Sequence, residues 1–480
     1  MKKEFIIILF IFTMLSSCSF KPKYVRPNAP IPKELPTDGV YSNISYENID
    51  IPNKLKWEDF FIDSKLKNII KIALENNRDL RLAILNVEKA RQIYGIKRAD
   101  LYPSIYATAN SSRKRISDDL SPLGKGYIQS EYSVNLGLAE WEIDFFGRIR
   151  SLKEEALEHF FAAKENRRSA QISLITEVAR VYFILASDIE HYKIANKLYK
   201  IAEHNFKLID SQYKAGIASD IDLNRAKSVL NEIKINIITY EQQIEKDKNA
   251  LNLLVGNKVS KDLLPSGLQS NFPMKDFSPG LSSLVLLNRP DILALEHKLK
   301  AAYANIGAAR AALFPRISLL AGIGTASNEL SGLFGSGSYV WKISGNAALP
   351  VFDARVWTAY KLSKLQRKLY LIQYERTIQN AFKEVLDTLV IRSTIDKQIA
   401  SQKNVIQSLQ HIYNLAYNRY RQGIDSYFFV LTAHKNLLYA KQKLIRLKLA
   451  KYINHVMMYS AFGGGGDFNE ENDKNILSEK

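Results

Sequence analysis

Tyr213-Lys-Ala-Gly-Ile-Ala-Ser219 and Tyr420-Arg-Gln-Gly-Ile-Asp-Ser426 are two copies of one turn sequence. Each has a tyrosine three positions before a glycine, an isoleucine directly after it and a serine three positions after it. Two further pairs are displaced by nearly the same distance along the chain: Leu101-Tyr-Pro-Ser-Ile105 with Leu313-Phe-Pro-Arg-Ile317, and Asp79 with Asp291. A displacement this long indicates a duplicated half-protein rather than a short solenoid repeat. We therefore expect pseudo-twofold internal symmetry.

Apolar residues on both sides of each turn recur at alternating steps of three and four, the spacing of a coiled-coil seam. The first half has this seam at Ile175, Val178, Tyr182, Leu185, Ile189 and Tyr192, and again at Leu223, Ala226, Leu230, Ile233, Ile237, Tyr240 and Ile244. The second half keeps the register at Val430, Ala433, Leu437, Ala440, Leu444 and Leu447. The proline-free run from about Arg148 to Ser211 would measure on the order of 95 Å as one helix. We predict two antiparallel coiled-coil hairpins, at 148–256 and 355–460, each turned by a glycine with positive φ, and an elongated structure rather than a compact bundle.

The segments before these hairpins have the two-residue period of β-strands. Alternating positions are apolar at Tyr132, Val134, Leu136 and Leu138 in the first half, and at Ile317, Leu319, Ala321, Ile323, Trp341 and Ile343 in the second. With a weaker run from Ser104 to Asn110, these predict four strands of about ten residues, the length that crosses a membrane when tilted. The two β-hairpins are expected near 103–143 and 315–352, with tips at Ser111–Lys125 and Ser331–Ser338.

Four strands cannot close a membrane barrel, since known barrels begin at about eight. An open strand edge in lipid leaves backbone N–H and C=O groups without partners, at several kcal/mol each. Other copies of the chain must therefore complete the sheet. From this arithmetic alone, closed rings of two, three or four copies are all possible.

The N-terminus has the pattern of a secretory signal peptide. Lys2-Lys3 precede an apolar run from Phe5 to Leu15 that is too short for a permanent membrane helix. The next residues, Leu15-Ser-Ser-Cys18, resemble the bacterial lipobox, in which the cysteine is acylated and becomes the first mature residue. The alternative is an ordinary signal peptide with an incidental cysteine. Cys18 is the only cysteine, so no disulfide is expected, and a covalent lipid at Cys18 is the only non-protein group predicted.

The sequence shows no pattern typical of an enzyme or a metal site. Its seven histidines form no HExxH or similar ligand spacing, and a second cysteine for a thiolate site is absent. Gly463–Gly466 lacks the Lys-Ser/Thr of a phosphate loop and is better interpreted as a helix stop. The net charge of +18 comes from dispersed lysines and arginines on an exported protein, so we predict a solvated surface and no nucleic-acid partner.

Taken in order, these segments resemble the TolC-like outer-membrane efflux factor family, and within it the lipoprotein branch. The resemblance covers nearly all of the mature chain. Its carriers are Leu15-Ser-Ser-Cys18, Tyr24-Val-Arg-Pro27, Trp57-x-x-Phe-Phe-x-Asp63, Asn77-Arg-Asp-Leu80, Trp141-Glu-Ile-Asp-Phe-Phe-Gly-Arg148, Asn288-Arg-Pro-Asp291, Leu313-Phe-Pro315 and the final Ala461-Phe-Gly-Gly464.

The resemblance implies a mainly α protein with a transmembrane β-barrel. Three copies would form a 12-stranded barrel in the bacterial outer membrane, continued by a long helical barrel in the periplasm. It also implies a passive exit channel of a tripartite efflux pump, with a periplasmic membrane-fusion adaptor and an inner-membrane RND-type transporter as partners. The rival hypotheses are a periplasmic coiled-coil adaptor or scaffold lipoprotein and, with only the signal peptide in its favour, an envelope hydrolase.

In the family, the two glycine turns lie at the periplasmic tips, where they narrow the entrance and meet the adaptor. The corresponding residues are Tyr213, Gly216, Ile217, Ser219, Tyr420, Gly423, Ile424 and Ser426. Family members often carry an acidic residue about nine positions after the second glycine, whereas this chain has Thr432, with Phe428 one turn before it and Lys435 after it. We therefore expect an apolar aperture at Phe428, with Tyr427 as its neighbour.

The expected organisation has five parts. A signal peptide at 1–17 is followed by a lipidated, proline-rich extended segment at 18–56. The first structural repeat covers 57–260 and the second covers 261–466. A polar tail at 467–480 is expected to be disordered.

Overall fold

The computed structural model describes residues 20–44, 55–268, 273–278, 280 and 282–464. The predicted signal peptide at 1–17, Cys18 and the tail at 467–480 lie outside the described residues.

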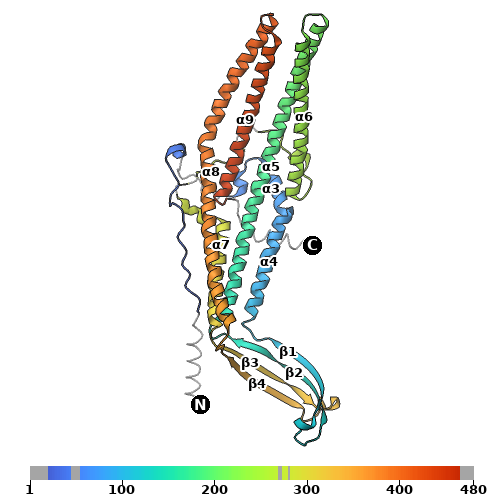
Figure 1. Cartoon of the computed structure of the whole chain (residues 1–480), viewed down its shortest axis with the longest axis vertical. Coiled ribbons are helices and arrows are strands. Elements are labelled where there is room, and N and C mark those ends of the chain that lie inside the picture. The colour runs from blue at the N-terminus through green and yellow to red at the C-terminus, as the bar shows by residue number, and fades with distance from the viewer. Residues whose placement is uncertain (1–19, 45–54, 269–272, 279, 281, 465–480) are drawn as a thin grey trace. The chain divides into compact units, whose positions relative to one another are not determined.

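The two halves of the chain contain matching elements in the same order (Figure 1). The first half has α4 (Arg78–Ala99), β1 (Ile105–Ile116), β2 (Tyr127–Ile143), α5 (Arg148–Lys214) and α6 (Asp220–Val255). The second has α7 (Pro290–Ala311), β3 (Arg316–Ser327), β4 (Tyr339–Ala348), α8 (Ala354–Arg421) and α9 (Tyr427–Ala461). The matched long helices are nearly equal, with 67 and 68 residues in α5 and α8 and 36 and 35 in α6 and α9. The predicted duplication is confirmed at the level of elements.

Shorter elements precede and connect the repeats. They are η1 (Gly39–Asn43), α2 (Trp57–Phe60), α3 (Ser64–Asn76), η3 (Asp118–Leu120), η4 (Lys261–Leu263), η5 (Ser283–Asn288) and η6 (Leu330–Gly332). None of the described helices combines the length and the apolarity that crossing a membrane requires.

The chain forms two compact units that cut across the sequence repeats. Unit 1 contains the described residues up to Asn28 together with Asn86–Lys164 and Ala294–Tyr374, and so holds all four strands. Unit 2 contains the described residues of Ala29–Leu85, Glu165–Leu293 and the chain from Glu375 onward, including both glycine turns. Each unit therefore takes residues from both halves of the duplication.

The largest apolar core lies in unit 2, around α3. Leu66, Ile69, Ile70 and Ala73 face inward at i, i+3, i+4 and i+7 and are fully buried, as the helical period predicts. Asp63 caps this helix by accepting hydrogen bonds from the backbone N–H of Lys65 and Leu66. The buried ring of Phe60 stacks on Tyr459, 4.0 Å between centroids, which joins the N-terminal part of the unit to the end of α9.

In unit 1, the strands form one antiparallel sheet in the order β1-β2-β3-β4, so β1 and β4 are its edges. All four predicted strands are found, but two are longer than expected. β1 has 12 residues rather than the predicted run to Asn110, and β2 has 17. The first tip therefore begins after Ile116, not at Ser111. The polar residues Ser111 and Ser112 obscured the strand because backbone pairing with β2, rather than alternating hydrophobicity, maintains it there.

The N-terminal segment of unit 1 lies along α7 without forming a helix or strand. Its Tyr24 hydroxyl donates a hydrogen bond to Glu296 (3.2 Å), and Arg26 forms an ion pair with the same carboxylate (2.7 Å). At its start, Phe20 stacks on Phe314, with ring centroids 4.4 Å apart. These contacts fix residues 20–26 against the helix that leads into β3.

Candidate functional site

The four-stranded sheet has one apolar and one polar face. The register places one set of alternating residues on a common face, and this set is almost entirely apolar: Ile105, Ala107, Ala109, Val134, Leu136, Leu138, Ala321, Ile323, Tyr339, Trp341 and Ile343. The opposite face is mainly polar or glycine, with Thr108, Asn110, Asn135, Ser133, Gly322, Gly324, Lys342, Ser344 and Asn346, and it also carries Tyr106, Leu320 and Val340. Trp341 and Ile343 are exposed in the single chain. This segregation is typical of a membrane barrel with an apolar exterior and a polar interior.

Close backbone approach explains the glycines on the polar face. A Cβ on Gly324 would lie 2.2 Å from the backbone oxygen of Val134, and one on Gly137 would lie 2.4 Å from that of Ala321. Side chains cannot be accommodated at these positions without moving the strands apart.

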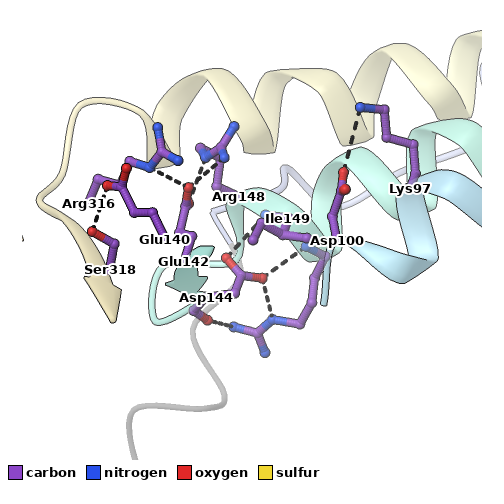
Figure 2. A network of polar contacts seen from close by, with 10 residues as sticks. Lys97, Asp100, Glu140, Glu142, Asp144, Arg148, Ile149, Arg316 and Ser318 are labelled. Carbon is purple, nitrogen blue, oxygen red and sulfur yellow. Dashed lines mark hydrogen bonds and ion pairs between the residues drawn. The ribbon is translucent and has the colours of Figure 1, made fainter. Parts of the chain in front are cut away.

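A network of charged side chains lies at the end of the polar face where the strands join the helices (Figure 2). Glu142, on β2, accepts two hydrogen bonds from Arg148 at the start of α5, at 2.8 and 2.6 Å, and an ion pair from Arg316 on β3 at 2.6 Å. The buried carboxylate thus neutralises two arginines from different elements. Ser318 donates a hydrogen bond to Glu140 (2.8 Å) beside it.

Asp144 caps α5 in the same network. Its carboxylate accepts hydrogen bonds from the backbone N–H groups of Ile149 (3.1 Å; Figure 2) and Arg150 (2.9 Å). An acidic side chain at a helix N-terminus accepts hydrogen bonds from free N–H groups and also interacts favourably with the positive end of the helix dipole. The sequence Trp141–Arg148, which supported the resemblance, therefore holds a strand-to-helix junction. The contacts of Glu142 and Glu140 with β3 could not be predicted from sequence spacing, because their partners Arg316 and Ser318 come from the other repeat.

In unit 2, the two predicted glycine turns have the same geometry. Gly216 and Gly423 have φ of 75° and 72°, and each donates its N–H to the tyrosine carbonyl three residues earlier, at 2.9 Å. Ser219 caps α6 by accepting the N–H of Asp222 (3.1 Å). Ser426 occupies the equivalent position before α9 but makes no side-chain cap hydrogen bond. Arg419 instead braces the second turn through two hydrogen bonds to Asp425, at 2.6 and 3.1 Å.

The isoleucines after the glycines are exposed, Ile217 by 77% and Ile424 by 57%. Tyr213 is also exposed, whereas Tyr420 is half-buried and donates a hydrogen bond to Gln212 (2.9 Å). The eight predicted tip residues are therefore an exposed apolar pair, two N-cap serines, of which only Ser219 makes a side-chain cap hydrogen bond, and two tyrosines around two left-handed glycines.

The four predicted aperture residues do not share one surface. Tyr427 is only 5% exposed and packs with Ile209, Ala226 and Val430 in the core between the hairpins, and this burial raises the pKa of its hydroxyl. Tyr427 belongs to the coiled-coil seam here, and its role as a neighbour of the aperture stays a prediction. Phe428, Thr432 and Lys435 lie on the exposed face of α9.

Two of these residues contact the neighbouring helix α6. The guanidinium of Arg225 lies 5.0 Å from the ring centroid of Phe428, which is a cation–π distance. Lys435 forms an ion pair with Glu232 (3.6 Å). Thr432 donates its hydroxyl to the backbone oxygen of Phe428 (2.9 Å) and so makes no polar contact across the helices there.

A partly buried acidic pair between α5 and α6 was not predicted from the sequence. Asp188 lies beside Asp247, and burial, followed by this neighbour, raises the pKa of Asp188 to about 7. Gln243 donates to one Asp247 oxygen (2.9 Å). His191 stacks on Tyr240 nearby, and burial lowers its pKa to about 4, with Arg446 as a smaller cause. The signal was present in the sequence, since Asp247 interrupts the apolar side of α6.

No group of three or more His, Cys, Asp or Glu side chains suited to a metal ion occurs in the described part of the chain. The candidate functional features are therefore surfaces, namely the two faces of the sheet and the exposed glycine turns.

Comparisons with known proteins identify the class. The family model "Outer membrane efflux protein" matches residues 69–257 and 281–464. The solvent efflux pump outer membrane protein SrpC of Pseudomonas putida is 40% identical over 95% of this chain and 97% of that protein. The cation efflux system protein CusC of Escherichia coli O157:H7 is 34% identical over 94% of this chain and 96% of that protein. Among solved structures, the open state of the Neisseria gonorrhoeae MtrE outer membrane channel has a TM-score of 0.84 and 34% identity, covering 93% of this chain and 98% of that one.

The chain combines a sheet that has an apolar and a polar face with pairs of long helices. Together with these similarities, this identifies its class as outer-membrane efflux channels. It belongs to the outer membrane efflux protein family. The predicted family, fold class, efflux function and outer-membrane location are confirmed. The relatives are transport proteins, in agreement with a role other than catalysis. The residue roles at the turns, the aperture and Cys18 stay predictions.

Proposed function

We propose that three copies of this chain form the passive exit duct of a tripartite efflux pump. The observation that carries the proposal is the two-faced sheet with β1 and β4 as open edges. An edge strand in lipid has unpaired backbone groups, so the apolar face can enter the membrane only if another copy pairs with each edge. Three copies supply twelve strands and enclose the polar face.

The polar interior would conduct solutes through water. It would select little beyond size and charge, because Ser, Thr and Asn are frequent on the polar face and its charged side chains include both signs, Glu131 and Lys342. The energy then comes from an inner-membrane RND-type transporter, connected by a periplasmic adaptor. Two of the relatives are named for solvent efflux and cation efflux, so an organic solvent and a cation are the cargoes to assay first.

Fractionation and unboiled gel electrophoresis test the duct. Recovery from outer membranes as a stable oligomer that forms ion-conducting pores in planar bilayers supports it. Release in soluble form supports the rival periplasmic scaffold.

The exposed turns are the proposed adaptor contact. Ile217 and Ile424 are large apolar side chains that are mostly exposed in the chain, and their burial against an adaptor would stabilise the complex. Substitution of both by Ser should weaken adaptor binding at least ten-fold in pull-down titrations and leave pore conductance unchanged. Ile238→Ser, at an exposed isoleucine on α6 away from the turns, serves as the control.

The proposed aperture is centred on Phe428. A ring of three phenylalanines would close the entrance sterically, and Arg225 holds each ring in place. Phe428→Ala should raise single-channel conductance, whereas the adjacent Phe429→Ala should not. Unchanged conductance in Phe428→Ala removes this residue from the gate.

Lipidation at Cys18 is a separate proposal, supported by the lipobox-like Leu15–Cys18. Cys18→Ser should abolish labelling with a fatty-acid analogue yet leave the oligomer assembled, since the strands hold it in the membrane. Labelling that persists in Cys18→Ser refutes this acceptor. Ser19 should allow onward sorting to the outer membrane, because an aspartate at that position is the retention signal.

A further inference from the structure

The basic sequence Arg113-Lys-Arg115 lies near the end of β1. All three side chains are exposed, and none forms an ion pair with another described residue. In a strand, successive side chains point to opposite faces. The three bases therefore divide between the two faces of the sheet.

The register assigns each base to a face. Arg113 pairs with Ser130 and Arg115 with Ile128, in the row that continues through Ser111–Tyr132 and Ala109–Val134 on the apolar face. Lys114 pairs with Gln129 and belongs to the polar face, next to the pair formed by Ser112 and Glu131. Two arginines thus extend the apolar face with uncharged cross-strand partners, while the lysine has an acidic residue diagonally across on its own face.

The depth of the arginines follows from the same rows. Tyr132 and Tyr339 end the apolar band with aromatic rings, the usual position of a barrel's interfacial girdle. Arg113 lies one row beyond Tyr132 on the same face, a further ~7 Å along the strand. All four strands join their helices at the opposite end, so the arginines lie at the membrane surface that faces away from the helices.

We propose that Arg113 and Arg115 bind phosphate groups of an anionic lipid in the outer leaflet, an inference that rests on the proposed membrane duct. A guanidinium forms paired hydrogen bonds with phosphate oxygens, and its aliphatic stem packs on apolar surface while the charged end reaches the headgroups. In the turn that follows β1, Asp118 accepts a hydrogen bond from the backbone N–H of Gly126 (2.5 Å). The patch is continuous with the lipid-facing band, so its occupant is membrane lipid rather than free phosphate.

Diphosphoryl lipid A is the probe. The intact oligomer in detergent is titrated with it and binding is followed by native mass spectrometry, using the unsubstituted chain, R113Q/R115Q and the matched K114Q. Each lost arginine should weaken binding about five-fold, so R113Q/R115Q should bind on the order of 25-fold more weakly. K114Q should bind as the unsubstituted chain does. Excess inorganic phosphate should not displace the lipid.

Three results overturn the inference: equal weakening in K114Q and R113Q/R115Q, unchanged binding in R113Q/R115Q, or equal binding of dephosphorylated lipid A. Flotation with zwitterionic phospholipid vesicles separates this failure from failure of the duct. Insertion without lipid A selectivity removes only the arginine site, whereas absence of insertion removes the duct and the site with it.

Discussion

The carboxylate of Asp63 satisfies donors from two distant parts of unit 2. One oxygen caps α3, accepting from Lys65 N (2.8 Å) and Leu66 N (3.4 Å), and the other accepts the Tyr182 hydroxyl of α5 (2.9 Å). Burial, together with Asp63, raises the pKa of Tyr182. The cap was predictable from sequence, since Asp63 precedes an apolar helical run. The Tyr182 bond was not, because the tyrosine also fits the coiled-coil seam.

Asp63→Ala should lower the free energy of unfolding of unit 2 by about 3 kcal/mol, the sum of a lost cap and an unpaired buried hydroxyl. Asp63→Asn, which retains an acceptor oxygen, should cost about 1 kcal/mol. The midpoint of urea unfolding, followed by circular dichroism, measures both. Ser219→Ala, which removes an exposed cap, is the control and should cost less than 1 kcal/mol. Equal effects of the Asp63 and Ser219 substitutions to Ala would contradict the double role of Asp63.

At the scale of elements, the long helices and their turns followed from heptad spacing and a repeated glycine. The strand lengths did not, because Ser111 and Ser112 carry no hydrophobic signal and pair through their backbone alone. The charged junction at Glu142 was also hidden, since its partners Arg148 and Arg316 belong to different repeats. Local periodicity is enough to predict helices and strands, whereas contacts between the two repeats can be identified only once the fold is known.

The glycine turns give a test of backbone strain. Gly216→Ala and Gly423→Ala should each destabilise the protein by about 1 kcal/mol, because both φ angles are positive. No atom lies within 4 Å of the added Cβ at either site, so crowding does not contribute. Gly95→Ala, equally uncrowded but within α4, should instead stabilise by about 0.5–1 kcal/mol. Thermal unfolding measures all three, and the same sign at Gly95 as at the turns would contradict the account.

The acidic pair between α5 and α6 predicts a pH dependence. The pKa of Asp188 is about 7 in the folded chain and lies above its ordinary value of 3.8. The folded state therefore binds this proton more tightly, and the associated stabilisation, complete at low pH, is lost as pH rises toward 7. Since Asp188 is half-buried, we expect a discounted loss on the order of 1–2 kcal/mol between pH 5 and 8.

Other groups at this site should not mask the effect. Burial keeps His191 neutral across the range, with a pKa near 4, and burial raises the pKa of Tyr240. Urea midpoints at pH 5 and pH 8 measure the slope. Asp188→Asn should flatten it, whereas Glu245→Gln, at an exposed acid of α6, should leave it unchanged. A slope that persists in Asp188→Asn would assign the dependence to other groups.

At the scale of the whole molecule, the single chain presents an incomplete structure. Its sheet has an apolar face, a polar face and two open edges, β1 and β4. The sequence alone indicated that other copies must pair with these edges but left two, three or four copies open. The family resemblance, rather than the strand arithmetic, selects three.

Disulfide crosslinking of the edge strands tests this closure most directly. Cys18 is the only native cysteine, so in a Cys18→Ser chain any disulfide reports an engineered contact. Each variant carries one cysteine on β1 and one on β4, at Thr108 and Ser344 or at neighbouring positions along these strands. On non-reducing denaturing gels the account predicts crosslinked dimers and trimers, with no larger species, for the pairs in register. Monomer at every pair, or a ladder that continues beyond three copies, would contradict it.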